Sequence, residues 1–396
     1  MASNVVAEIL PADTNGKPGR RSPIRALLMT LPIVVWSMLM PMGFLGQHPS
    51  KLHVVSAILT MAFMDAMFFM MMLTSETHRW RRWYFVALGW LFPVGFMWNL
   101  MTTRGTMGIP MEEMIAGRTP YCFLPTPTLI LPAALFKTVV FPGSILPNGG
   151  MSGGGIAMMV GLWLAFTIVL GKGWCSYACF FGGLEEGCSA VAKKPKIRDI
   201  DPRWRYGAWA VLLAVVLLSL ALFEPAYCMW LCPFKAVTEY VAANNLLGMI
   251  QNAIFIVIFL ALVIVLPILT KKRTQCGFFC PFGAFQSLFN KISVFDVKID
   301  RAKCNDCKLC QSSCPTMAMT KESVARGETL MGCMKCGACV DACTRGAAVW
   351  HIKGTDVAVK PERARLLFLY SAWAMAIMFG GSIITGSVYT ILHWIV

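Results

Sequence analysis

The sequence predicts an all-α integral membrane bundle of about seven spanning helices with a small α+β domain near its C-terminal end. Of the 396 residues, 57% are hydrophobic and only 14% are charged, whereas a soluble globular chain carries about 25% charged residues. Apolar runs of about 20 residues, the length that spans a bilayer, recur along the chain. The one long polar stretch, 274–362, holds ten of the sixteen cysteines.

Seven apolar runs are long enough to cross the hydrocarbon core of a membrane. The predicted spans are 26–46, 52–73, 83–101, 154–171, 206–223, 248–269 and 366–391. A further apolar stretch, 121–141, contains or adjoins five prolines, and each proline removes a backbone donor and clashes with the preceding helical turn. We therefore predict that 121–141 is re-entrant or lies on the membrane surface.

The distribution of charge sets the predicted orientation. A net charge of +15 could indicate nucleic-acid binding, but the lysines and arginines cluster at the ends of apolar runs, as in cytoplasmic loops of membrane proteins. With the N-terminus inside and 121–141 not crossing, the basic segments 78–82, 193–205 and 271–273 all face the cytoplasm. We predict a multi-pass protein of the inner membrane, N-terminus inside and C-terminus outside, with no nucleic-acid partner.

These spans divide the chain into four predicted parts. Residues 1–25 form a cytoplasmic tail, and 26–273 form a membrane domain with six spans and the proline-rich stretch. Residues 274–362 form a small cytoplasmic domain, and 363–396 contain the final span.

The cytoplasmic segment contains one cysteine pattern twice. The first run is Cys304, Cys307, Cys310 and Cys314, and the second is Cys333, Cys336, Cys339 and Cys343. In the bacterial two-cluster ferredoxin pattern, C-x2-C-x2-C-x3-C, each run gives three thiolates to one four-iron cluster and its fourth cysteine to the other. The sequence therefore predicts a ferredoxin-like domain with two 4Fe-4S clusters. Cluster 1 would be held by Cys304, Cys307, Cys310 and Cys343, and cluster 2 by Cys333, Cys336, Cys339 and Cys314. Zinc also binds CxxC pairs, but zinc does not need two interleaved runs of four.

Three CxxxC motifs form a second repeat, and each begins close to the end of a predicted span. They are Cys175 with Cys179, Cys228 with Cys232, and Cys276 with Cys280. Successive copies should alternate sides, so the first and third pairs could meet at the cytoplasmic face as four soft ligands for a further iron cluster or for zinc. The second pair would lie outside as a redox-active thiol pair, a metal site or a disulfide. The alternative is that CxxxC marks a tight turn with inert buried thiols.

Two further features lie within the predicted spans. Asp65 stands in the middle of the second span, where a carboxylate is costly and indicates a functional site, such as a proton acceptor for quinol. An interhelical hydrogen bond is the alternative. The same span is rich in methionine, whose thioethers can bind Cu(I) but also fill gaps in ordinary packing.

CxxxCP motifs beside spanning helices, followed by a two-cluster pattern, resemble the membrane-bound polyferredoxins of the NapH and NosR type. The resemblance covers about 154–350, and the CxxxCPFGA block at 276–284 is its sharpest part. It implies electron transfer from membrane quinol toward a periplasmic reductase, such as nitrate or nitrous-oxide reductase. In some members it implies a role in cofactor maturation or in transcriptional control.

The sequence favours an iron–sulfur electron-transfer protein that relays electrons between the quinone pool and a partner redox enzyme. Two adjacent clusters make a relay, whereas a sensor needs only one. The alternatives are an iron–sulfur redox sensor or regulator and a copper maturation factor. The residues do not encode the partner enzyme, the direction of electron flow or the oligomeric state.

Overall fold

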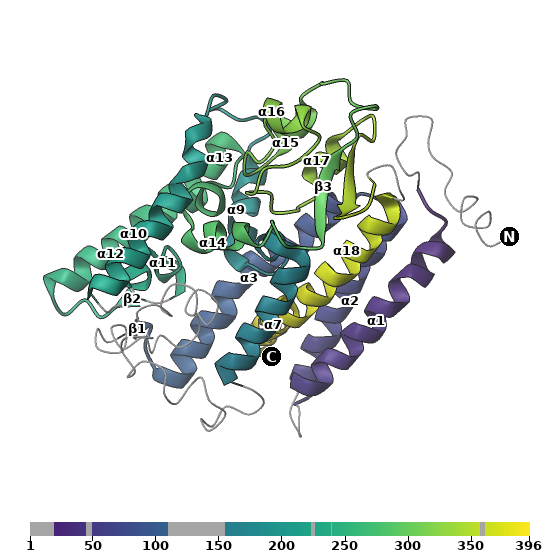
Figure 1. Cartoon of the computed structure of the whole chain (residues 1–396). Helices are drawn as coiled ribbons and strands as arrows, with labels where there is room; N and C mark the ends of the chain where they lie inside the picture. The colour runs from purple at the N-terminus through teal and green to yellow at the C-terminus, as the bar shows by residue number, and fades with distance from the viewer. Residues whose placement is uncertain (1–19, 45–49, 110–154, 223–225, 239, 357–360) are drawn as a thin grey trace.

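The computed structural model describes residues 20–44, 50–109, 155–222, 226–238, 240–356 and 361–396 (Figure 1). The proline-rich stretch 121–141 and most of the predicted tail 1–25 lie outside these residues. Within the described part the chain is mostly helical, and a helix stands at each of the seven predicted spans.

The long helices follow the apolar runs of the sequence. They are α1 (Pro23–Phe44), α2 (Lys51–Thr74), α3 (Thr77–Arg104), α7 (Gly155–Leu170), α10 (Gly207–Leu222), α12 and α13 (Leu246–Ile258 and Leu266–Thr270), and α18 and α19 (Pro361–Met375 and Ser382–Ile395). π-helical turns at Phe259–Val265 and Ala376–Gly381 join the halves of the last two. The shorter connecting elements are α8 (Trp174–Tyr177), α9 (Phe180–Val191), α11 (Lys235–Thr238), α14 (Pro281–Leu288), β1 (Gly108–Ile109) and β2 (Tyr240–Val241).

Several of these helices are long and apolar enough to cross a membrane. Among the described residues four qualify, namely 51–74, 202–222, 246–270 and 361–395. A fifth is added if the segments 161–177 and 180–191, which meet at a bend of 44°, count as one broken span. The chain is therefore a multi-pass type of membrane protein with four or five candidate spans by length and composition.

Glycines allow two helices to approach closely near the centre of the helical region. A Cβ on Gly89 of α3 would lie 2.4 Å from the backbone nitrogen of Leu184 in α9, and one on Gly183 would lie 2.1 Å from the carbonyl oxygen of Phe85. Small residues at such crossings permit the backbone contact that stabilises helices in lipid. The crossing fixes α9, which carries charged residues of the site described below.

The segment between α13 and α18, here called the insert, contains a two-stranded sheet and several short helices. Strand β3 (Phe295–Ile299) pairs antiparallel with β4 (Ala348–Ile352). Between them lie three short helices, α15 (Leu309–Ser313), α16 (Lys321–Ala325) and α17 (Ala338–Ala342). Trp350 of β4 is 2% exposed and stacks on Phe368 of α18 at 4.2 Å between ring centroids, so the sheet is anchored on a membrane helix.

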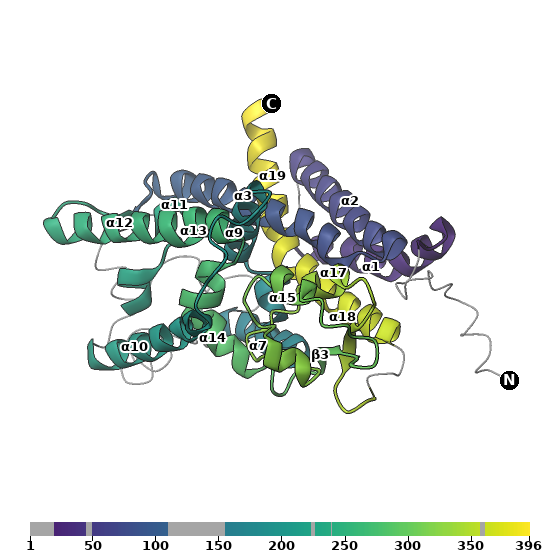
Figure 2. The same ribbon diagram turned by 90° about the horizontal axis from the view of Figure 1, so that it is seen from above.

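The insert covers one end of the long helices (Figures 1 and 2). The carboxylate of Asp341 accepts the backbone N–H groups of Thr77 and His78 at the start of α3. The ammonium of Lys335 donates to the carbonyl oxygen of Leu170 at the end of α7. The basic segments predicted to share one side of the membrane therefore lie at the same end of the helices, under the insert.

Candidate metal centres

The first cysteine cavity lies near the surface of the insert. Its lining includes Cys304, Cys307, Cys310 and Cys343, and Cys307 is exposed to solvent. The structure thus brings together three cysteines of the first run and the last cysteine of the second, which is the set that the sequence predicts for cluster 1. We call this cavity the outer cavity.

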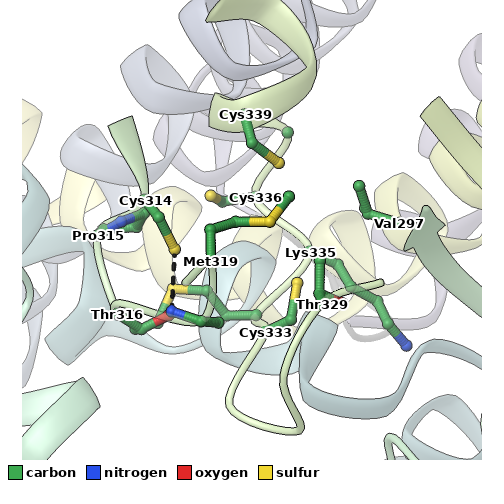
Figure 3. Close-up of a pocket in the computed structure, with 13 residues that line it drawn as sticks. Val297, Cys314, Pro315, Thr316, Met319, Thr329, Cys333, Lys335, Cys336 and Cys339 are labelled. Carbon is green, nitrogen blue, oxygen red and sulfur yellow. Dashed lines mark hydrogen bonds between the residues drawn. The ribbon is translucent and has the colours of Figure 1, made fainter. Parts of the chain in front are cut away.

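The second cysteine cavity, the inner cavity, is lined by insert residues on the side where Cys336 packs with Cys175 and Cys276. Its lining includes Cys314, Cys333, Cys336 and Cys339, and Figure 3 shows their sulfurs around one space. Cys336 and Cys339 are 6% and 8% exposed. This is the set predicted for cluster 2.

The two cavities share one loop design. In each run the second and fourth residues after the first cysteine have positive φ: Asp306 and Lys308 in the first run, and Lys335 and Gly337 in the second. These left-handed turns curl each loop so that its thiols face one space. In both runs the backbone N–H four residues after the last cysteine donates to that cysteine's sulfur at 3.2 Å.

The donor chemistry of both cavities fits an iron–sulfur cluster. Thiolates are the ligands of such clusters, and hydrogen bonds to sulfur help to set their potential. Burial raises the pKa of the Cys336 and Cys339 thiols, so these groups are neutral at pH 7 unless a metal replaces their protons. In the described part of the chain, no three His, Cys, Asp or Glu side chains lie close enough together to bind one metal ion. The cysteines instead line the two cavities in sets of four.

The first and third CxxxC motifs meet below the inner cavity, as the alternation of sides predicts. Cys175 and Cys276 are buried and pack in one cluster with Cys336 and Met334. The thiol of Cys280 lies near enough to Cys175, Cys179 and Cys276 to interact with them electrostatically. We call Cys175, Cys179, Cys276 and Cys280 the quartet.

The CxxxC turns are built alike. The N–H of Cys179 donates to the carbonyl oxygen of Trp174, and that of Cys280 to Gln275, so each turn closes around its first cysteine. The second cysteines, including Cys232, all have extended backbones. The repeat seen in the sequence is thus also a repeat of local conformation.

Buried cations surround the cysteine sets, and the sequence analysis did not single them out. Arg81, Arg273 and Lys172 are 0%, 1% and 3% exposed. Arg273 donates to the carbonyl oxygen of Cys175 at 3.0 Å, and Lys172 interacts electrostatically with Cys175 and Cys280. Arg81 and Arg273 pair with Glu186. Buried charges need partners, and metal-bound thiolates of the quartet would offset the charge of Lys172. The signal in the sequence was charge immediately beside the CxxxC motifs.

The second CxxxC pair lies in the interior rather than at the free end of the helices. Cys228 and Cys232 are both 6% exposed, and Cys232 packs in an aromatic cluster that includes Phe180, next to Cys179. A hydrogen bond joins Gln275 to the hydroxyl of Tyr227. The chain after α10 therefore turns back toward the quartet.

Asp65 has the interhelical partner that the alternative reading requires. The hydroxyl of Ser37 in α1 donates to Asp65 Oδ2 at 2.9 Å, while Oδ1 is buried with no hydrogen bond within the described residues. The methionines of α2 lie mainly in the core, where Met64, Met71 and Met72 pack with Phe68.

Comparison with known families agrees with this arrangement. The family described as "4Fe-4S binding domain" matches 152–198, 206–250 and 252–300, one stretch for each CxxxC motif. The family described as "4Fe-4S dicluster domain" matches 296–344, which spans all eight insert cysteines.

Curated relatives extend the match beyond the cysteines. An uncharacterised protein of Methanocaldococcus jannaschii is 28% identical over 46% of this chain and 74% of its own length. The ferredoxin-type protein NapH of Haemophilus influenzae is 27% identical over 45% of this chain and 62% of its own length. The regulatory protein NosR of Pseudomonas aeruginosa is 28% identical over 43% of this chain but 24% of its own length. These matches support a membrane polyferredoxin of the NapH and NosR type. No solved structure matches this chain.

Proposed function

We propose that this polyferredoxin relays electrons through two 4Fe-4S clusters between the membrane quinone pool and a partner redox enzyme. One observation carries the proposal: two four-cysteine cavities of the same design stand one outside the other, the outer at the surface of the insert and the inner against the helix ends. A partner protein can reach the outer cavity, and the inner cavity faces the membrane domain. Such an order suits a relay better than a sensor.

The ligand sets follow from the lining of the cavities. Cys304, Cys307, Cys310 and Cys343 would hold cluster 1, and Cys333, Cys336, Cys339 and Cys314 would hold cluster 2. When bound, the clusters supply one-electron redox chemistry. The protein supplies the loops that aim the thiols and the N–H groups that donate to sulfur.

We further propose that the quartet is a third metal centre. Its four thiols lie together in the interior, Cys175 and Cys276 touch the inner cavity through Cys336, and buried cations stand beside them. The ammonium of Lys172, 3% exposed, interacts electrostatically with Cys175 and Cys280 of the quartet. A thiolate–metal centre would offset that charge and would continue the relay into the membrane.

The proposed topology has seven spans, with the N-terminus and the insert in the cytoplasm of a cell with an inner membrane. The support is the position of the basic helix ends, which lie together beneath the insert, as the positive-inside rule requires. Asp65, held by Ser37 and with one oxygen unpaired among the described residues, is the proposed proton acceptor for quinol.

The deciding experiment is a count of iron and acid-labile sulfide in protein purified without oxygen. Two clusters predict about 8 irons per chain, and a four-iron quartet would raise this to about 12. Reduction of the clusters by a quinol analogue would support the quinone link, and its loss in Asp65→Asn would support the proton role. Stoichiometric zinc with little iron would refute the relay, and copper retained through purification would favour the maturation alternative.

A further inference from the structure

A buried group of three charged side chains lies between the inner cavity and the quartet. Glu186 of α9 pairs with Arg81 of α3 at 2.5 Å and also with Arg273, just before the third CxxxC motif. All three side chains are 5% exposed or less. We call Arg81, Glu186 and Arg273 the central triad.

The central triad touches both cysteine sites. Arg273 donates to the carbonyl oxygen of Cys175 at 3.0 Å and to the sulfur of Met334 at 2.9 Å. Arg81 donates to the carbonyl oxygen of Ser176. Both guanidinium groups interact electrostatically with Cys336, a predicted ligand of cluster 2, and Arg273 also interacts with Cys276 of the quartet.

The central triad carries one net positive charge. His78 lies beside the triad, with its Nε2 3.7 Å from Glu186 Oε1. The next residue along α9, Glu185, directs its carboxylate at the backbone N–H groups of Gln275 and Cys276. The two guanidinium groups therefore share the carboxylate of Glu186 as their ion-pair partner, while Glu185 and Asp341 act on Arg273 and Arg81 from farther away.

We propose that the central triad sets the reduction potential of the centre at the inner cavity, its arginines raising that potential above the one at the outer cavity. The inference rests on the proposed function, since it requires iron at the inner cavity. One-electron reduction makes that centre more negative by one charge, and the electron comes from a low-potential reductant. Buried positive charge stabilises the reduced form because the local dielectric is low, and charge near a cluster is a recognised determinant of its potential.

The chain contains a matched control. Glu362 pairs with Arg21 and Arg365 at the starts of α1 and α18. These arginines are 7% and 4% exposed, but Arg21 donates to the carbonyl oxygen of Met72 and lies beside no cysteine that the structure describes. The set has the same composition as the central triad and similarly buried arginines, with a carboxylate that is 17% rather than 5% exposed, but it lies elsewhere in the fold.

The test is a redox titration of the full-length protein, reduced stepwise with dithionite and followed by electron paramagnetic resonance. The two insert signals are assigned with Cys310→Ser, which should perturb the signal of the outer centre and leave that of the inner centre. Arg273→Gln should lower the midpoint potential of the inner centre, and Glu186→Gln should raise it. Arg273→Lys should restore most of the loss, and Arg21→Gln should change neither centre. The outer centre is an internal reference throughout.

Opposite shifts from neighbouring side chains are the diagnostic result, because general loosening of the fold would move both variants in one direction. If both variants shift the inner potential the same way, or leave it unmoved, the inference is wrong. If Arg273→Gln loses its iron, Arg81→Gln takes its place. Arg81→Gln and Glu186→Gln should then shift the midpoint potential of the inner centre in opposite directions. A wild-type protein without iron would refute the proposed function itself, which is a different result from clusters whose potentials do not move.

Discussion

The outer and inner cavities are built from the same loop and placed in opposite surroundings. The outer cavity has an exposed cysteine, Cys307, beside an exposed ion pair of Arg301 and Asp306. The inner cavity has the buried Cys336, which packs with Cys175 and Cys276 and lies near the buried guanidinium groups of Arg81 and Arg273. Since solvent exposure and nearby charge both tune cluster potentials, the comparison teaches that one duplicated motif can supply two different redox sites through packing alone.

The strongest test of this difference removes one ligand from each cavity. Cys307→Ser should lose the outer cluster and retain about 4 irons if only the insert clusters are present, because the loop lies at the surface. Cys339→Ser should lose nearly all insert iron, since the insert docks on the membrane helices around the inner cavity. Iron analysis with limited proteolysis of the insert measures both effects. Retention of half the iron in Cys339→Ser would show that the cavities are independent.

A smaller effect, a loss of insert stability, is expected when a large side chain packed near each cavity is truncated. Trp350 is buried on Phe368, and its truncation to alanine should lower the stability of the insert by about 3–5 kcal/mol. Leu309 lines the outer cavity and is 41% exposed, so Leu309→Ala is the matched change on that side and should cost much less. Denaturant titration followed by proteolysis of the insert compares them, and equal losses would contradict the difference in burial.

A substitution at the crossing of α3 and α9 should destabilise the protein less than truncation of Trp350. Gly89→Ala places a methyl group against the backbone of α9, and such overpacking costs about 1–3 kcal/mol. It should displace Glu186 and broaden the spectrum of the inner centre while leaving the outer one unchanged. Gly161→Ala, which meets nothing within 4 Å, is the control. A changed outer spectrum would mean that the disturbance is not local.

The smallest effect is expected at the exposed ion pair. Arg301 and Asp306 lie 2.8 Å apart on the surface of the outer loop, and exposed pairs contribute little because water and salt screen them. Arg301→Gln should leave iron content and thermal unfolding unchanged. A clear fall in either would show that the pair holds the loop in its left-handed conformation.

The sequence predicted the features that depend on local spacing. The interleaved cysteine sets follow from residues three or four apart, and the meeting of Cys175 with Cys276 follows from the alternation of spans. The interior position of Cys228 and Cys232 could not be predicted from the alternation of spans. That argument assumes that each apolar run leads straight out of the membrane, whereas the chain after α10 turns back. The ion pairs among Arg81, Glu186 and Arg273 could not be predicted either. Any two of these residues are at least 87 positions apart in the sequence, and only the folded chain brings them into contact.

The closed surroundings of the inner cavity bear on how the protein is assembled. Contacts beside its lining residues join Asp341 to α3, Lys335 to α7, and the backbone N–H of Arg273 to the carbonyl oxygen of Pro315. The final membrane helices are synthesised after the insert that they help to anchor. We expect the iron donor to act in the interval before the insert docks, so that maturation is a timed step during synthesis rather than a repair available to the finished protein.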